Sequence, residues 1–171
     1  MKKQVVIVGT GGQGVLFVTR VIVEAAFVSG WPVISSETHG MAMRGGSVVS
    51  LVKIGKYLSP AVEQGQADVL LGLTPEEAQA YSYYLKPRGI QVINAKENGK
   101  GTVDAEGIAR KMGQPRSGNM IFLGYAARQA KLGLEYEKYL EAIERLSPAR
   151  FREQNRTGFR AGYELDAGRA R

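Results

Sequence analysis

The chain has 171 residues, of which 44% are hydrophobic, so its length fits one domain, residues 1–171, with a sizeable core. No apolar run approaches the roughly eighteen residues of a transmembrane helix, and no cysteine is present to form disulfides, act as a nucleophile or bind iron–sulfur clusters. The net charge of +7 comes mainly from the segment that begins at Arg145, which carries no nucleic-acid-binding motif. We therefore expect no contact with nucleic acid or membrane, and interpret the basic segment as a solvated face or a surface for an acidic ligand or partner.

The first part of the chain predicts a strand, a helix and two further strands. Gln4–Val8 is a short β-branched run that ends at a glycine, which is typical of a buried interior strand. Apolar residues at helical spacing follow, so we expect a helix from about Gly12 to Ser29 that crosses over the sheet. Pro32–Ser35 is the next predicted strand, at the spacing of a parallel crossover, and Ser47–Ile54 is a third whose short preceding loop suits antiparallel pairing.

The rest of the chain continues the alternation of strands and helices. Thr74, Pro75 and Glu77 predict a helix start, as an N-cap, a proline at the first helical position and a capping box. The further elements expected are strands Asp68–Leu73 and Ile90–Ile93, a loop Asn94–Gly101, and helices from Thr74 to about Leu85, Asp104–Met112, Ile121–Leu132, Glu135–Leu146 and Pro148 to about Gly162. The pattern predicts an α/β fold, a Rossmann-like and mostly parallel sheet with flanking helices and a helical C-terminal segment from about residue 119.

A glycine-rich turn follows the first predicted strand. Gly9, Gly11 and Gly14 have the spacing of the dinucleotide-binding fingerprint, with Gly12 and Gln13 between them. Glycines allow positive φ and a close approach of phosphate to the next helix, whose free N–H groups favour anions. Three interpretations stay open: a tight turn that binds nothing, a site for an anion or phosphate group, and a full NAD site.

A second glycine-rich segment, residues 37–47, contains side chains suited to contacts with a partner or ligand. We predict Arg44 as its main polar anchor, because a guanidinium forms two parallel hydrogen bonds to a carboxylate or phosphate; Arg44→Ala should therefore weaken the contact with the partner or ligand. His39 is open to a structural, a contact or an acid–base role, and we assign no catalytic residue and no metal ligand. Glu37 lies where a ribose-binding acid of an NAD site would sit. The predicted contact residues are Glu37, His39, Met41, Met43, Arg44, Gly45 and Gly46.

Both glycine-rich strings together resemble one protein family. Gly9–Gly14 followed by Glu37–Ser47 resembles the gamma-type subunit of 2-oxoacid:ferredoxin oxidoreductases, closest to the beta (small) subunit of indolepyruvate ferredoxin oxidoreductase. Further segments agree along the whole chain: Asp68–Leu73, Asn119–Gly124, and Asn155 with Phe159 and Gly162. The sequence departs from the pattern of two substrate branches of the family. Met43 stands where arylpyruvate subunits carry Gln, and the Tyr-Gly-Pro-Glu string of pyruvate-type gamma subunits is absent.

The resemblance implies a subunit that is not active alone. Such complexes decarboxylate a 2-oxoacid oxidatively with thiamine diphosphate, pass electrons through iron–sulfur clusters to ferredoxin, and release an acyl-CoA. The resemblance puts thiamine diphosphate and the clusters on a large alpha subunit and leaves CoA as a ligand of the glycine turn. The absence of cysteine fits a reducing compartment, so we expect a cytoplasmic location. The open alternatives are a stand-alone NAD(P)- or nucleotide-binding Rossmann protein and a gamma subunit for pyruvate or another 2-oxoacid; whether the isolated chain forms a homodimer also stays open.

Overall fold

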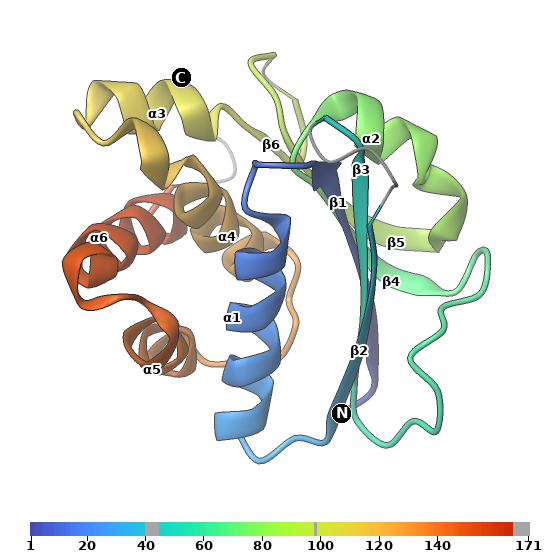
Figure 1. Cartoon of the computed structure of the whole chain (residues 1–171). Helices are drawn as coiled ribbons and strands as arrows, with labels where there is room; N and C mark the ends of the chain where they lie inside the picture. The colour runs from blue at the N-terminus through green and yellow to red at the C-terminus, as the bar shows by residue number, and fades with distance from the viewer. Residues whose placement is uncertain (40–44, 98, 166–171) are drawn as a thin grey trace.

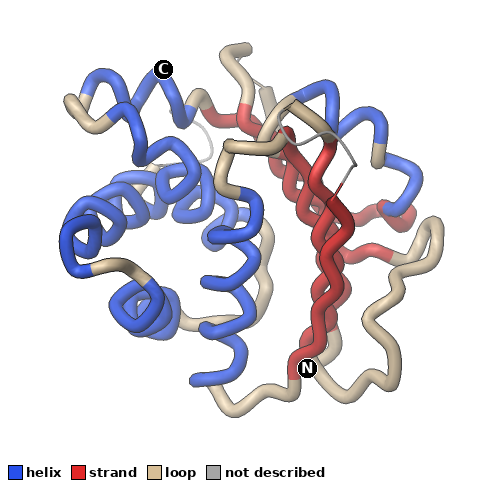
Figure 2. The backbone as a smooth tube through the Cα atoms, viewed as in Figure 1, coloured by secondary structure: helices blue, strands red, loops and turns tan. Residues whose placement is uncertain are grey.

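The computed structural model describes residues 1–39, 45–97 and 99–165, and shows the predicted α/β fold with a helical C-terminal segment (Figure 1). The same elements are coloured by type in Figure 2. In chain order they are β1 (Lys3–Thr10), α1 (Val15–Val28), β2 (Val33–His39), β3 (Ser47–Ile54), β4 (Ala67–Gly72), α2 (Pro75–Ala80), β5 (Leu85–Asn94), β6 (Thr102–Val103), α3 (Ala105–Lys111), α4 (Gly118–Gln129), α5 (Tyr136–Leu146) and α6 (Arg152–Tyr163).

The strands of the described residues form one six-stranded sheet in the order β2-β3-β1-β4-β5-β6. β3 is antiparallel to both of its neighbours, whereas β1, β4, β5 and β6 run parallel to one another. The prediction of an interior first strand is confirmed, since β1 lies between β3 and β4. The expectation that β1, α1 and β2 form a parallel crossover between neighbouring strands needs a correction. β2 does run parallel to β1, but β3 lies between the two strands and pairs with both.

The two faces of the sheet are covered unequally. Val5 and Ile7 of β1 point into the larger core beneath α1, α3, α4, α5 and α6, while Val6 and Val8 point into a smaller core beside α2 and the segment 55–66. Both faces of this strand are therefore buried, which explains why its sequence is a continuous apolar run and not an alternating one. The larger core places the predicted helical tail against α1, on one side of the sheet (Figure 2).

Helices α4 and α6 cross at glycine residues. A Cβ on Gly124 would lie 2.0 Å from the carbonyl oxygen of Phe159, and a Cβ on Gly162 would lie 1.9 Å from the carbonyl oxygen of Ile121. Since no side chain can occupy those positions, the two backbones are in direct contact. Phe159 lies in the larger core with Tyr139, its ring centroid 5.4 Å from that of the tyrosine.

The region from Thr74 to Asn94 differs from the prediction. Helix α2 ends at Ala80 and not near Leu85. Tyr81 follows it, and the 3-10 turn Ser82–Tyr84 then brings the rings of Tyr81, Tyr83 and Tyr84 into contact. β5 then begins at Leu85 and includes the Pro87–Gly89 stretch expected to end the helix. This stretch bulges away from β4, and Arg88 takes a φ of +64°. The short strand β6 lies between the predicted loop Asn94–Gly101 and the predicted helix Asp104–Met112, where the sequence predicts no strand.

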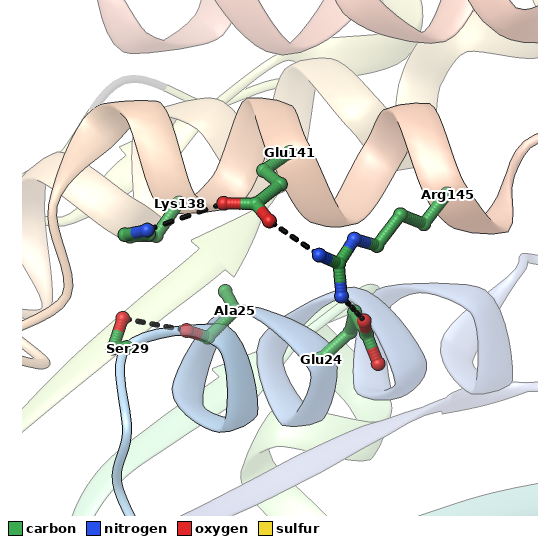
Figure 3. Close-up of polar contacts among 6 residues, drawn as sticks. All are labelled: Glu24, Ala25, Ser29, Lys138, Glu141 and Arg145. Atoms are coloured by element: carbon green, nitrogen blue, oxygen red, sulfur yellow. Dashed lines mark hydrogen bonds and ion pairs between the residues drawn. The ribbon is translucent and has the colours of Figure 1, made fainter.

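Arg145 links α5 to α1 by ion pairs (Figure 3). Its guanidinium donates to Glu24 at 3.0 Å and to Glu141 at 2.6 Å, and the side chain is 51% exposed. Because exposed ion pairs are screened by water, we expect Arg145→Ala to lower the free energy of unfolding by less than about 1 kcal/mol. Thermal unfolding followed by circular dichroism, with Lys138→Ala as a control that removes only the Lys138–Glu141 pair, measures this; a loss above about 2 kcal/mol contradicts it.

Candidate functional site

The structure brings the two glycine-rich segments together. The amide of Gly11 donates a hydrogen bond to the carbonyl oxygen of Gly46 at 2.9 Å, and the end of β1 pairs with the start of β3, Thr10 opposite Ser47. A Cβ on Gly11 would lie 3.6 Å from that same oxygen. The second segment therefore covers Gly11, and we call this contact the glycine junction.

The first segment forms a tight turn closed by its own hydrogen bonds. The amide of Thr10 donates to Oε1 of Gln13 at 2.7 Å. Position 9 must be a glycine, because a Cβ there would lie only 2.7 Å from Cγ2 of Val15. Gly14 has a φ of +84° and precedes the first turn of α1, which has no side-chain cap and no acidic residue. The turn therefore presents free backbone N–H groups at a helix start, as the phosphate interpretation requires.

Two pockets open beside this turn, at the carboxyl ends of β1, β4 and β5. One has a volume of about 540 Å³ and contacts Gly12, Gly14, Glu106 and Arg116; the other, about 400 Å³, lies beyond Gln13. Ligands of open α/β sheets bind at this edge, where strand order reverses around the first strand. Arg116 forms no ion pair among the described residues, so its charge is available to an anion in the larger pocket.

Asn94, which the sequence did not single out, organises the wall of these pockets. It is only 6% exposed, its Oδ1 accepts from the amide of Ala105 at 3.0 Å, and its Nδ2 donates to the carbonyl of Leu73 and to Glu106. It thus joins the ends of β4 and β5 to the start of α3 and fixes the position of the Glu106 carboxylate. The available signal was a polar residue directly after a buried strand.

The structure describes only part of the second glycine-rich segment, residues 37–39 and 45–47. Glu37 is exposed on β2, two strands away from β1, about 10 Å by strand spacing, whereas a dinucleotide fold has the second strand directly beside the first. The interpretation of Glu37 as a ribose ligand therefore lacks the expected geometry. His39 ends β2 and pairs with Val48 through the backbone; the predicted contacts Met41, Met43 and Arg44 lie outside the described residues.

Helix α2 is tied to the glycine junction. Thr74 caps it as predicted, accepting from the amide of Glu77 at 3.3 Å. In a full capping box the Glu77 carboxylate would accept from the amide of Thr74. Here it accepts instead from the hydroxyl of Ser47, at 2.8 Å. No group of metal-binding side chains is found in the described ranges, and no helix in them is long and apolar enough to cross a membrane.

Comparison with known proteins identifies the family. The family described as pyruvate ferredoxin/flavodoxin oxidoreductase matches residues 4–165, nearly the whole chain. The chain belongs to this family. Among family relatives, the indolepyruvate oxidoreductase subunit IorB of Archaeoglobus fulgidus is 41% identical over 97 residues, an alignment that spans 57% of this chain and about half, 48%, of that subunit.

Other members of the pyruvate ferredoxin/flavodoxin oxidoreductase family match from end to end. IorB of Methanothermobacter thermautotrophicus is 30% identical over 95% of this chain and 97% of its own length. The keto/oxoacid ferredoxin oxidoreductase gamma subunit of Geobacter sulfurreducens superimposes with a TM-score of 0.76, at 28% identity, covering 95% and 96% of the two chains. The chain is thus a small-subunit member of the 2-oxoacid:ferredoxin oxidoreductases.

Two of the segments that carry the family resemblance meet in one contact. Asn119–Gly124 begins in the first turn of α4, and Phe159 and Gly162 belong to α6, so the α4–α6 crossing joins them. Asn119 also lies against Gly14, where a Cβ would come within 2.3 Å of its Nδ2. The crossing therefore sets the position of the pocket wall next to the turn before α1.

Proposed function

We propose that this chain is the non-catalytic small subunit of a thiamine diphosphate- and iron–sulfur-dependent complex that converts an arylpyruvate such as indolepyruvate into an acyl-CoA and reduces ferredoxin. The observation that carries the proposal is the end-to-end match with a small subunit named for indolepyruvate oxidoreductase. The chain itself contains no cysteine to bind iron–sulfur clusters. The proposal therefore places the clusters, together with thiamine diphosphate, on a large partner subunit in the cytoplasm.

The glycine junction is the part of the chain we propose for the contact with the partner and with CoA. Gly12 has a φ of +95° and open space where a Cβ would stand, and it lines the larger pocket together with Gly14 and Arg116. These residues fit a phosphate group of CoA: the backbone N–H groups donate to it and the guanidinium balances its charge. CoA supplies the thiol that accepts the acyl group, and this chain's residues hold and orient its phosphate end.

Purification of the tagged chain from its native host tests this proposal. We expect a large iron–sulfur subunit to co-purify, and the complex to reduce methyl viologen with indolepyruvate and CoA, while the chain alone gives no turnover. Pyruvate and 2-oxoglutarate serve as competing substrates, because Met43 departs from the arylpyruvate pattern. Turnover by the chain alone, or purification without any partner, contradicts the proposal.

The Arg44→Ala variant tests the second glycine-rich segment in the same complex. Loss of co-purification assigns Arg44 to the subunit contact, and intact assembly with a raised KM for CoA assigns it to the ligand. Arg44→Lys is the matched control, since lysine keeps the charge without the two parallel hydrogen bonds. Wild-type assembly and wild-type CoA kinetics in the alanine variant contradict a contact role for Arg44.

A further inference from the structure

A pair of lysines converges on one tyrosine at the end of the sheet opposite to the glycine junction. The ammonium of Lys2 lies 5.4 Å and that of Lys53 lies 5.0 Å from the ring centroid of Tyr57. The sheet produces this arrangement, since Lys53 of β3 stands beside Gln4 of β1, and Lys2 is two residues earlier on the same face. The chain start lies at the lower end of the sheet in Figure 1, far from the start of α1.

The positive charge of this pair is not neutralised within the described residues. Neither Lys2 nor Lys53 forms an ion pair there, although two like charges near one ring repel each other. The nearby carboxylate of Asp68 is engaged by Lys86 and by the amide of Gln4, the latter at 2.7 Å. Burial raises the pKa of Tyr57, and Asp68 raises it further, so the phenol stays neutral and supplies no counter-charge.

An apolar pocket shares Lys2 with this pair of lysines. It has a volume of about 270 Å³ and is lined by Met1, Trp31, Pro32 and Gly55 together with Lys2 and Lys56. The start of β2 and the end of β3 are held together here, because the amide of Gly55 donates to the carbonyl of Pro32 at 2.7 Å. Leu58, which follows Tyr57, is fully exposed. The lining of this apolar pocket thus includes two lysines, Lys2 and Lys56, that form no ion pair among the described residues.

We propose that this surface, formed by Lys2, Lys53, Lys56, Tyr57 and the Trp31 pocket, docks an acidic segment of a partner protein that carries one large apolar side chain. The apolar side chain fills the pocket and the carboxylates contact the lysines around it, the usual arrangement of a central anchor with a charged rim. A symmetric contact with a second copy of this chain would place lysines opposite lysines, so the charges favour a different, acidic partner.

Trp31 is the only tryptophan of the chain, so its fluorescence reports on the pocket directly. The probe is a synthetic peptide of Glu and Asp residues around one central Leu, titrated into the full chain. We expect a saturable change of the Trp31 emission, about tenfold weaker binding when Gln and Asn replace the acids, and weaker binding when Ser replaces the Leu. Raising NaCl from about 50 mM to about 500 mM should also weaken binding.

Charge reversal tests the named lysines. The double variant Lys2→Glu with Lys53→Glu should bind the peptide at least about tenfold more weakly, while Lys100→Glu, in an exposed loop at the opposite end of the sheet, should bind as the wild type does. Circular dichroism confirms that each variant is folded. Equal binding of the acidic and amide peptides, or an equal loss in Lys100→Glu, overturns the proposal. Polyphosphate or an oligonucleotide that competes with the peptide, with no effect of the Leu-to-Ser change, overturns it in favour of a phosphate-binding surface.

Discussion

Gly124→Ala is expected to lower the free energy of unfolding by about 3 kcal/mol or more, and the melting temperature by about 6–12 °C. The added methyl group would lie 2.0 Å from the carbonyl oxygen of Phe159 and 2.7 Å from the amide nitrogen of Tyr163. Both atoms belong to the backbone of α6, which cannot move aside as a flexible side chain would. Helices α4 and α6 must therefore separate, and the core that they share with α1 must loosen.

Gly118→Ala is the matched control in the same helix. The atoms nearest to a Cβ there belong to the Glu106 side chain, at 3.4 Å or more, an ordinary van der Waals distance, and the backbone of Gly118 is already helical. We expect its stability to stay within about 1 kcal/mol of the wild type, because alanine favours a helix over glycine. Urea unfolding of both variants measures the difference, and similar stabilities of Gly124→Ala and Gly118→Ala would show that α4 and α6 do not cross at backbone distance.

The second large effect is expected from Asn94→Ala. The substitution leaves the carbonyl of Leu73 and the amide of Ala105 without their side-chain partner in a buried site, which should cost about 2–3 kcal/mol of folding free energy. It also releases the carboxylate of Glu106, which faces both pockets. The variant should therefore lose stability and also bind CoA more weakly if the larger pocket holds the ligand.

Glu106→Gln serves as the control for Asn94→Ala. The amide keeps a carbonyl oxygen that can accept from Asn94, so we expect a stability change below about 1 kcal/mol. Thermal unfolding of the two variants separates the buried hydrogen bonds of Asn94 from the charge of Glu106. A loss of stability in Glu106→Gln as large as that in Asn94→Ala would assign the effect to the carboxylate instead.

Local sequence patterns predicted the elements whose cause is local. The apolar run of β1, buried on both faces, and the capping of α2 by Thr74 are two examples. Both could be predicted because each depends on a few neighbouring residues. The place of β2 in the sheet could not be predicted in this way, since it depends on β3 pairing with both β1 and β2. The early end of α2 could not be predicted either, because it depends on the tyrosines that follow the helix: Tyr81 and Tyr84 pack on the smaller core, and Tyr83 contacts them both.

The candidate site was predicted as two separate motifs and not as one contact. The hydrogen bond from Gly11 to Gly46 follows from the pairing of β1 with β3, which no local pattern shows. The sequence predicts Asn94 only as the start of a loop. Its buried role depends on Leu73, Ala105 and Glu106, which are distant in the sequence, so no local pattern reveals it. The glycines of the α4–α6 crossing entered only through the family resemblance, since close backbone contact between distant helices has no signature in a single sequence.

The packing of α1 against α5 has a consequence for how the chain is made. Ile22 and Ala25 of α1 share the larger core with Tyr139 and Ile143 of α5, more than a hundred residues later in the sequence. A ribosome therefore releases β1 and α1 long before the helices that cover them exist. Until then the apolar face of α1 is exposed to solvent and to chaperones, and folding of the larger core must wait until α5 has been synthesised.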